Sequence, residues 1–270
     1  MLICPICQSA LTEHENSVRC IFQHSFDRAR QGYFNLLPVQ HKKSRAPGDN
    51  LAMVQARRDF LSAGYYAPAA QRLATLMQER QPQRWLDIGC GEGYYSAHIA
   101  QAIPNSQGYA LDISRDAVKQ ACKRDAKTTW LVASMARLPL ASNSCQAITS
   151  IFSPIDWAEA ERVLAPGGAV LRIGPHSDHL LELREKLYDK VYHYDDSKHL
   201  QHVPVNMQLI HSETLRFKLT LDEAQARENL LAMTPHGWRA STEKRQAVIN
   251  HPLTTTVAIR YDWIEKMEDK

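Results

Sequence analysis

A glycine-rich stretch, LDIGCGEGYY at residues 86–95, constrains the fold more than any other feature of the chain. An apolar run that can form a buried strand ends at Asp87, and Gly89, Gly91 and Gly93 follow. Glycines permit a tight turn and let the backbone approach a ligand, and the next helix begins with free N–H groups. Three glycines in five residues exceed what the end of a strand requires. The stretch therefore predicts a ligand-binding loop.

The apolar pattern after Arg84 predicts a parallel sheet. Short apolar runs alternate with helical segments, which is typical of a parallel sheet with helices on both faces. The expected strands are RWLDI (84–88), GYALDI (108–113), TWLVAS (129–134), AITSIF (147–152), AVLRIG (169–174), TLRFKLTL (214–221) and TTTVAIRYDWI (254–264). A helix is expected near residues 222–233 and a turn at LAPGGAVL (164–171). We therefore expect an α/β, Rossmann-like domain over residues 81–270.

Cysteine and histidine spacing in the first 24 residues predicts a metal site. Cys4 and Cys7 form one pair, and Cys20 and His24 form a second pair after twelve intervening residues. Two ligand pairs separated by a hairpin-sized loop suit a tetrahedral zinc ion. Four protein ligands leave no position for a substrate, so the ion would be structural. Three free thiols are the alternative, and His14 is an alternative fourth ligand.

The segment that holds these ligands is expected to be a zinc-binding module over residues 1–35. It is too short to bury enough apolar surface to fold alone, and metal binding of about 10–16 kcal/mol would supply the difference. Residues 36–80 are expected to be a basic linker followed by two helices, which Gly64 and Pro68 separate within residues 51–79.

Composition and cysteine content indicate in which cellular compartment the protein is found. The chain is 44% hydrophobic and 23% charged, as in ordinary globular proteins. Three of the six cysteines lie in the first 20 residues, which favours a metal site in a reducing compartment over a disulfide framework. The sequence lacks the roughly 20-residue apolar run of a membrane span and the pattern of a signal peptide. We expect a cytoplasmic protein with no membrane partner.

An acidic residue on each of two strands points to the ligand. The spacing GxGxG after an acid differs from the dinucleotide pattern GxGxxG, and Asp87 would face the ammonium of the methionine moiety of S-adenosylmethionine. Asp112, at the end of the next strand, can accept hydrogen bonds from both ribose hydroxyls. The segment 134–136 would line the adenine. Cys90 is expected to be a packing residue, with nucleophilic work as the alternative. A nicotinamide dehydrogenase is the rival class, but the full combination resembles the Rossmann-like methyltransferases.

Basic and aromatic residues gather near the N-terminus. The basic residues are Arg19, Arg28, Arg30, Lys42, Lys43, Arg45, Arg57 and Arg58. The interleaved aromatic residues are Phe22, Phe26, Tyr33 and Phe34. Such clusters attract phosphates and can stack on unpaired bases. A solvated basic face over a small aromatic core explains the same pattern.

Several segments together resemble the bacterial 23S rRNA (guanine-N1)-methyltransferases. They are CPIC (4–7), GYFNLLPVQHKKSRAPGD (32–49), MVQARRDFLSAGYY (53–66), LDIGCGEGYYS (86–96), HLLELREKLY (179–188) and MTPHGWRA (233–240). The segment 32–49 is the most specific, because generic methyltransferase architecture does not demand it.

The resemblance implies a site and partners. Its four zinc ligands map onto the two pairs above, and its S-adenosylmethionine contacts map onto Tyr66, Gly91, Glu92 and His179. Tyr66 would reach the cofactor as a lid does, and a surface imidazole is the alternative for His179. The family also implies 23S ribosomal RNA as substrate and a homodimer whose zinc modules flank an RNA cleft.

The expected reaction is methyl transfer to N1 of a guanine in 23S rRNA. N1 normally carries a proton, and Asp156 is a candidate base, with a helix cap as its alternative role. The region after the fourth strand matches the family only at Pro154 and in its overall helix pattern, so no catalytic residue is assigned. It contains neither an NPPY-type tetrapeptide nor a Pro-Cys pair, which argues against adenine-amine and cytosine-C5 targets. A methyltransferase of another RNA or of a small molecule, and a catalytically silent RNA-binding protein, are the rivals.

Overall fold

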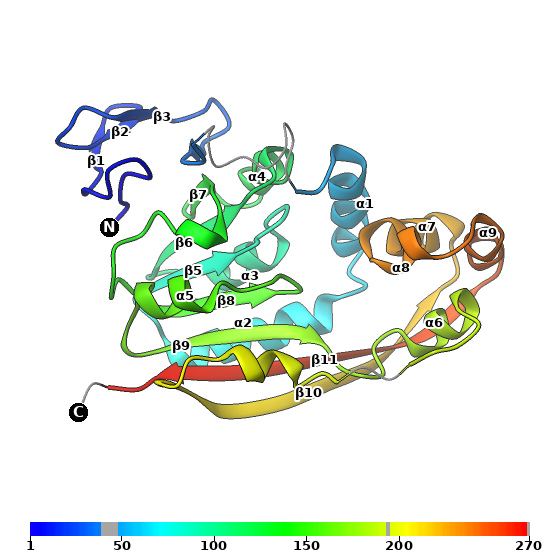
Figure 1. Cartoon of the computed structure of the whole chain (residues 1–270). Coiled ribbons are helices and arrows are strands. Elements are labelled where there is room, and N and C mark those ends of the chain that lie inside the picture. Colours follow the sequence, from blue (N-terminus) through cyan, green and yellow to red (C-terminus); the bar gives the residue numbers. More distant parts are fainter. Residues whose placement is uncertain (39–47, 193–194, 269–270) are drawn as a thin grey trace.

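An eight-stranded mixed sheet forms the centre of the protein (Figure 1). The structure is a computed structural model that describes residues 1–38, 48–192 and 195–268. The strand order is β10-β11-β9-β8-β5-β6-β7-β4. The strands are β4 (Phe34–Asn35), β5 (Arg84–Ile88), β6 (Gln107–Asp112), β7 (Thr129–Val132), β8 (Cys145–Ile151), β9 (Leu164–Pro175), β10 (Met207–Leu221) and β11 (Leu253–Lys266).

The parallel half of the sheet confirms the predicted strands. β5 lies between β6 and β8, and its last residue, Ile88, pairs with Leu111 of β6 and Ser150 of β8. β5 is an apolar run because both of its faces are covered. The carboxyl ends of these parallel strands therefore meet at one edge, where α/β proteins bind ligands.

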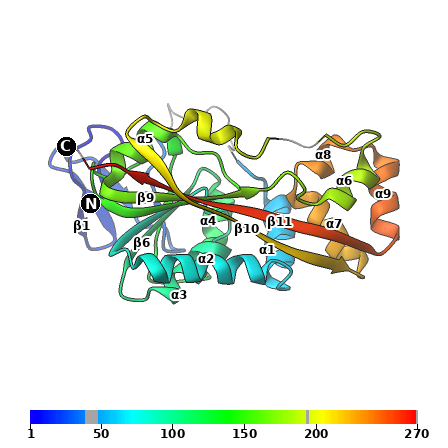
Figure 2. The same ribbon diagram turned by 90° about the horizontal axis from the view of Figure 1, so that it is seen from below.

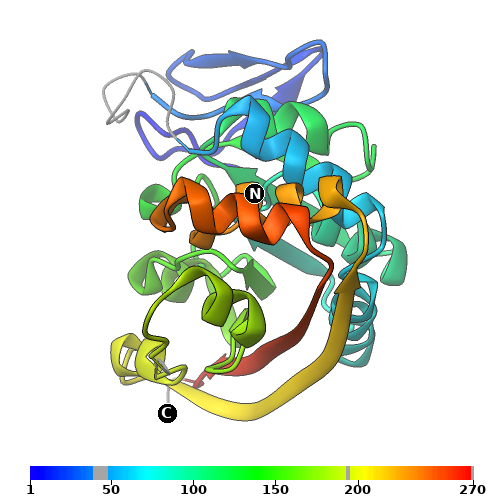
Figure 3. The same cartoon turned by 90° about the vertical axis from the view of Figure 1, so that its right-hand side faces the viewer.

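A long antiparallel hairpin extends the sheet on its other side. β10 and β11 pair from Met207 opposite Lys266 to Leu221 opposite Leu253, and Figure 2 shows them running most of the length of the protein. Helices α6 (Leu181–Leu187), α7 (Ala224–Met233), α8 (His236–Arg239) and α9 (Thr242–Asn250) gather at the far end of this hairpin. Figure 3 shows the hairpin curving around them. The sequence predicted α7 but not α8 or α9.

The two faces of the sheet have different covers. The remaining helices are α1 (Leu51–Ser62), α2 (Ala67–Arg80), α3 (Tyr94–Ala102), α4 (Arg115–Ala121) and α5 (Trp157–Val163). Trp85 packs with α2 and α3, while the next residue, Leu86, packs with α5 on the opposite face. Short 3-10 turns occupy Met135–Arg137 and Lys198–His202.

Local signals account for the predicted pair of helices. Asn50 caps α1 by accepting a hydrogen bond from the backbone N–H of Met53 at 3.0 Å. Gly64 takes a left-handed φ of 85°, which ends α1, and Pro68 lies in the first turn of α2. The separation of residues 51–79 into two helices is therefore confirmed.

The segment LAPGGAVL differs from its prediction. It is not a separate turn, because β9 begins at Leu164, directly after α5. Gly167 has a φ of 70°, and the pairing with β8 shifts register between Cys145 and Ala147. The two glycines thus form an irregularity inside the start of a strand, not a loop before it.

The N-terminal module shares its core with the sheet. It holds a three-stranded sheet of β1 (Thr12–His14), β2 (Ser17–Arg19) and β3 (Ser25–Asp27). Leu2 and Val18 belong to the same buried cluster as Leu86, and Ile3 N–H donates to the carbonyl of Pro139 at 3.0 Å. Immediately after the module, β4 joins the large sheet beside β7. The module therefore rests on the face that α5 also covers, and it has little core of its own, as expected.

No helix within the described residues combines the length and the apolar character that crossing a bilayer requires.

Candidate active site and metal centre

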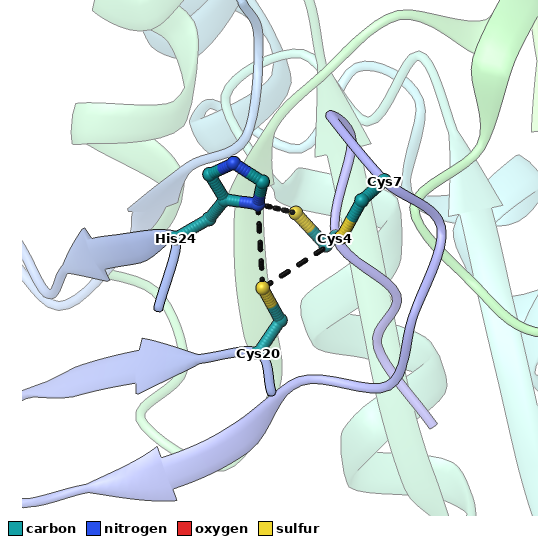
Figure 4. A group of neighbouring side chains, drawn as sticks. All are labelled: Cys4, Cys7, Cys20 and His24. Atoms are coloured by element: carbon teal, nitrogen blue, oxygen red, sulfur yellow. Dashed lines mark hydrogen bonds between the residues drawn. The ribbon is translucent and has the colours of Figure 1, made fainter. Parts of the chain in front are cut away.

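Four side chains of the N-terminal module converge as their spacing predicts (Figure 4). The sulfur atoms of Cys4, Cys7 and Cys20 and a ring nitrogen of His24 all lie within 4.8 Å of one another. The Sγ atoms of Cys7 and Cys20 are 3.7 Å apart, and His24 Nδ1 lies 3.5 Å from Cys4 Sγ and 3.4 Å from Cys20 Sγ. His14 is exposed on β1 and lies outside this cluster.

These separations match the edges of a zinc tetrahedron. Zinc bonds sulfur at about 2.3 Å and imidazole nitrogen at about 2.0–2.1 Å, so sulfur atoms lie about 3.8 Å apart and about 3.6 Å from the nitrogen. Three thiolates and one imidazole are donors that zinc prefers. The cluster thus fits zinc with a complete set of protein ligands, which is a structural rather than a catalytic arrangement.

A cavity of about 1250 Å³ opens at the carboxyl edge of the parallel strands. We call one wall the glycine-loop side; it includes Gly89, Gly91, Glu92, Leu111, Asp112 and Ser134. We call the rest of the lining the C-terminal side; it includes Phe152 and Arg172 near the strand ends, together with Arg184, Lys190, Trp238 and Arg239. Small-molecule sites usually have about 300–1000 Å³. The cavity therefore has room for a cofactor and a second group.

The glycine loop is shaped by close contacts that a side chain would block. A Cβ atom on Gly89 would come within 2.0 Å of Ser153 Oγ, and one on Gly93 would come within 2.8 Å of Ala121 Cβ. Both glycines also have positive φ values, 72° and 83°. The loop consequently packs against the segment after β8 on one side and α4 on the other. Cys90 within it is buried in an apolar cluster, in the packing position that was expected.

Asp112 ties the glycine loop to the end of β6. Its carboxylate accepts hydrogen bonds from the backbone N–H groups of Gly91 at 3.0 Å and Ser114 at 2.8 Å. Burial raises the pKa of this carboxyl, while the two N–H donors lower it. Asp112 lines the cavity, and each of its carboxylate oxygens has a further lone pair that these bonds do not use. Asp112 can therefore also accept hydrogen bonds from a pair of ribose hydroxyls.

Glu92 carries a buried acceptor with no partner. Its Oε2 atom pairs with Arg124, whereas its Oε1 atom is buried and has no hydrogen-bond partner among the described residues. Burial raises the pKa of this carboxyl, against the effect of Arg124. An unsatisfied buried acceptor on a cavity wall is costly unless a ligand donates to it. The residues present therefore fit S-adenosylmethionine, which has hydroxyl and ammonium donors.

Asp87 occupies a different position from the predicted one. It is buried and does not line the cavity. Its carboxylate accepts hydrogen bonds from Ser96 Oγ at 2.5 Å and Thr149 Oγ1 at 2.8 Å, because the side chain points toward α3, beneath the loop. Asp87 thus joins β5, β8 and α3, and the prediction that it faces an ammonium group is not supported by this geometry.

Burial also gives Asp87 a distinctive titration. Desolvation raises the pKa of its carboxyl to about 6, well above the usual value for an aspartate, despite two hydrogen bonds that favour the ionised form. The contribution of this carboxyl to stability is therefore fully present below its pKa in the unfolded chain. It is lost as the pH rises through its pKa in the folded protein, about 6. At pH 7 the buried charge costs on the order of 3 kcal/mol.

Replacing Asp87 by asparagine should remove this cost. We expect the unfolding free energy of Asp87→Asn, relative to the wild type, to rise by about 2 kcal/mol between pH 4 and pH 7 in the cofactor-free protein. The difference between the two proteins is the quantity to measure by denaturant titration, since burial lowers the pKa of His179 and His236 to about 4 in both. A difference that stays constant over this pH range would contradict the assignment.

Tyr66 and His179 meet across the cavity wall. The hydroxyl of Tyr66 lies 3.4 Å from Nε2 of His179, and both residues are buried and line the cavity. His179 Nδ1 also lies 2.9 Å from the carbonyl of Ala258. Burial lowers the pKa of His179 to about 4, so this imidazole is neutral at pH 7. The surface-imidazole alternative is therefore wrong.

Asp156 has the structural role that was its alternative. Its carboxylate caps α5 by accepting a hydrogen bond from the backbone N–H of Glu159 at 3.2 Å, and it does not line the cavity. The described carboxylates that do line the cavity are Asp49, Glu92 and Asp112. Asp49 pairs with Arg57 of α1, so each of the three has a partner away from the C-terminal side.

The sequence missed most of the C-terminal side of the cavity. Phe152 follows the last residue of β8, and Trp238 and Arg239 lie on α8 within the segment that carried the family resemblance. Ser134 and Met135, which were expected to line the adenine, do lie on the cavity wall. A run of aromatic and basic residues in MTPHGWRA was the available signal for the missed wall.

The N-terminal basic and aromatic residues divide into several groups. Lys42, Lys43 and Arg45 lie outside the described residues. Tyr33 and Phe34 are core residues, not a stacking surface, whereas Phe22 is 63% exposed. Arg28 lies 4.4 Å from the centre of the Phe34 ring. Exposed side chains of the module, Phe22 above all, are therefore the part of the predicted RNA-facing surface that the structure leaves accessible.

Comparison with known proteins defines the class. Residues 86–172 match a family model described as a methyltransferase domain, and residues 2–45 match a zinc-ribbon model described as the N-terminal part of RlmA. A structure from Bacillus halodurans C-125, described as a methyltransferase, has a TM-score of 0.51 at 15% identity and covers 72% of this chain and 98% of its own. The protein is a Rossmann-like, S-adenosylmethionine-dependent methyltransferase with an N-terminal zinc ribbon.

Relatives matched over nearly the full length define the family. A protein from Micromonospora griseorubida named for 23S rRNA (guanine-N1)-methyltransferase activity is 32% identical, over 96% of this chain and 95% of its own. The 23S rRNA (guanine(748)-N(1))-methyltransferase of Streptomyces fradiae is 31% identical, over 90% and 88%. The chain belongs to the family of 23S rRNA (guanine-N1)-methyltransferases.

Proposed function

We propose that this protein transfers a methyl group from S-adenosylmethionine to N1 of a guanine in 23S ribosomal RNA. The observation that carries the proposal is a single cavity that joins the glycine loop to a wall of aromatic and basic side chains. The first wall fits the cofactor, and the second wall fits an extruded base with its phosphates. Membership of a family named for this reaction selects the base and the atom.

The cofactor would be held by the glycine-loop side. Asp112 would accept hydrogen bonds from the ribose hydroxyls, and Glu92 would offer its unpaired oxygen. The backbone of Gly89 and Gly91 would lie against the methionine portion, and Tyr66 and His179 would close the site. Asp87 would support the loop from below without touching the ligand. When bound, S-adenosylmethionine supplies an electrophilic methyl group on a sulfonium.

The C-terminal side would prepare the guanine by electrostatics. N1 must lose its proton before or during the reaction, and among the described residues no carboxylate lines this side to accept it. Arg184, Lys190 and Arg239 line it instead. Positive charges near a titratable group favour its anionic form, so these side chains would lower the pKa of N1. We therefore assign the chain a role in stabilising the guanine anion. The N1 proton would pass to solvent water, and N1 would then form its bond to the methyl carbon as the bond from that carbon to the sulfonium sulfur breaks.

The remaining partners are proposed on the family resemblance. A guanine in a duplex must leave its stack to expose N1, and the open cavity would accept such an extruded base. The zinc module would contact the RNA through exposed side chains such as Phe22. A homodimer in the cytoplasm, with two modules flanking one RNA cleft, completes the proposal. Sedimentation of the purified protein as a monomer at micromolar concentration would contradict the dimer.

The function is tested by comparing ribosomal RNA from cells with and without the gene. Nucleosides released from purified 23S rRNA are quantified by mass spectrometry. We expect 1-methylguanosine to decrease in cells without the gene and to return when the gene is restored. An unchanged content of 1-methylguanosine would contradict the proposed target.

A further inference from the structure

We propose that Phe152 is the surface on which the target guanine stacks during methyl transfer. This inference rests on the proposed function and adds a positioning residue to it. The ring would fix the plane of the base, so that N1 faces the methyl group. Neither the glycine motif nor the zinc pattern indicates such a residue.

Phe152 lies where the acceptor base must arrive. It directly follows the last residue of β8, the strand that pairs with β5, which leads into the glycine loop. The next residue, Ser153, is so close to Gly89 that a Cβ atom there would lie 2.0 Å from Ser153 Oγ. The backbone around Phe152 therefore touches the loop that would hold the cofactor. A base stacked on this ring would lie beside that loop.

The ring contacts the two residues that would close the cofactor site. Its centroid lies 6.3 Å from that of Tyr66, in an edge-on arrangement, and 5.7 Å from that of His179. Both neighbours are buried, yet Phe152 itself is 43% exposed and lines the cavity. Phe152 thus presents apolar surface to the space that a second group would fill, and aromatic rings are the usual stacking partners of unpaired bases.

The backbone conformation at this position argues against a simple packing role. Phe152 has a φ of 52°, a left-handed conformation that is unfavourable for a bulky side chain and easy for glycine. Its N–H donates to the carbonyl of Ile173 at 2.8 Å, which holds the conformation in place. Strained residues of this kind cluster at functional sites. A phenylalanine thus stands where glycine would fold more easily, which supports a role for the ring itself.

Phe152 is better placed than the other aromatic residues on the C-terminal side. Trp238 lies on α8, a four-residue helix, and is 60% exposed, and Tyr192 is 67% exposed. The hydroxyl of Tyr188 lies 3.0 Å from His236 Nδ1. Among these, only Phe152 adjoins the sheet edge and the glycine loop. Trp238 and Tyr192 are suited instead to neighbouring nucleotides.

The test compares Phe152→Ala, Phe152→Gly and Phe152→Tyr in the full-length, zinc-loaded protein. The substrate is 23S rRNA from cells that lack the gene, and 1-methylguanosine formation gives kcat and KM. We expect kcat/KM to fall on the order of 10- to 100-fold in the alanine and glycine variants, because one base–aromatic contact is lost. The tyrosine variant, which keeps the ring, should stay within about threefold of the wild type.

Two controls separate stacking from structure. Affinity for S-adenosylmethionine, measured by calorimetry, should change by less than about threefold in all variants. The glycine variant should keep a Tm closer to that of the wild type than the alanine variant does, because glycine relieves the left-handed strain. Wild-type kcat/KM in both the alanine and the glycine variants would overturn the inference, as would a loss that falls on cofactor affinity alone. A wild-type protein that forms no 1-methylguanosine would instead contradict the proposed function.

Discussion

Replacing Cys20 by serine should reduce bound zinc from one ion per chain to none and lower rRNA methylation by at least about tenfold. Cys20 is one of the four converging ligands, and its Sγ atom lies 3.7 Å from Cys7 Sγ and 3.4 Å from His24 Nδ1. A hydroxyl is a poor zinc ligand, and an incomplete tetrahedron binds the ion weakly. Zinc binding supplies about 10–16 kcal/mol to modules of this size, so the three-stranded sheet should lose its order.

The consequence for the large domain should be smaller. The module packs on the sheet through Leu2 and Val18, so Tm should decrease, but none of its residues lines the cavity. Affinity for S-adenosylmethionine should therefore stay within a few-fold of the wild type. Cys122→Ser is the matched control, because Cys122 is the C-cap residue of α4 and lies outside the metal cluster, so this variant should keep the bound zinc. If cofactor affinity disappeared together with the zinc, the separation into a metal module and a cofactor domain would be wrong.

Asp112→Ala should weaken S-adenosylmethionine binding on the order of 100-fold or more, as measured by calorimetry. The substitution removes an acceptor for two ribose hydroxyls, and hydrogen bonds to a charged group contribute about 1.5–3 kcal/mol each. It also leaves the N–H groups of Gly91 and Ser114 without their acceptor, which loosens the glycine loop. Because Asp112 lies at the carboxyl end of β6, the sheet itself should remain folded.

The matched control is Asp116→Ala on α4. Asp116 is half-buried, with a side chain that is 43% exposed, and it pairs with Lys119 at 3.1 Å, a contact near the surface that contributes little. Its removal should leave cofactor affinity unchanged. Wild-type affinity in Asp112→Ala would show that the ribose is held elsewhere, and the assignment of the glycine-loop side as the cofactor wall would fail.

The features that the sequence predicted are those encoded by short spacing. The ligand pairs Cys4–Cys7 and Cys20–His24 each span one turn, so local geometry brings together the two ligands of each pair, and a short hairpin then joins the pairs. Asp112 lies at a strand end beside the glycine loop, so the parallel pairing of β5 and β6 brings it to Gly91. Such patterns need no knowledge of distant packing. For that reason the structure brings the zinc ligands together and places Asp112 beside the glycine loop, as the sequence predicted.

The features that the sequence missed depend on tertiary packing. The Asp87 side chain points toward α3 because the hydroxyls of Ser96 and Thr149 donate hydrogen bonds to it there. These two partners come from α3 and β8, so the sequence around Asp87 does not indicate them. Tyr33 and Phe34 are core residues because β4 pairs with β7 at the edge of the sheet. A strand of two residues has no sequence pattern from which it could be predicted. The wall that includes residues of α6 and α8 joins two separate segments: α6 follows β9, whereas the β10–β11 hairpin carries α8 to the cavity. No periodicity in the chain specifies that path.

The central claim is that the cavity moves a methyl group to N1 of guanine in 23S rRNA. It is tested most directly by incubating the purified protein with S-adenosylmethionine that carries a deuterated methyl group and with 23S rRNA from cells lacking the gene. Mass spectrometry of the released nucleosides then locates the label. The label should appear in 1-methylguanosine and should be absent with Asp112→Ala. Label on another base, on another atom of guanine, or on no nucleoside would contradict the claim.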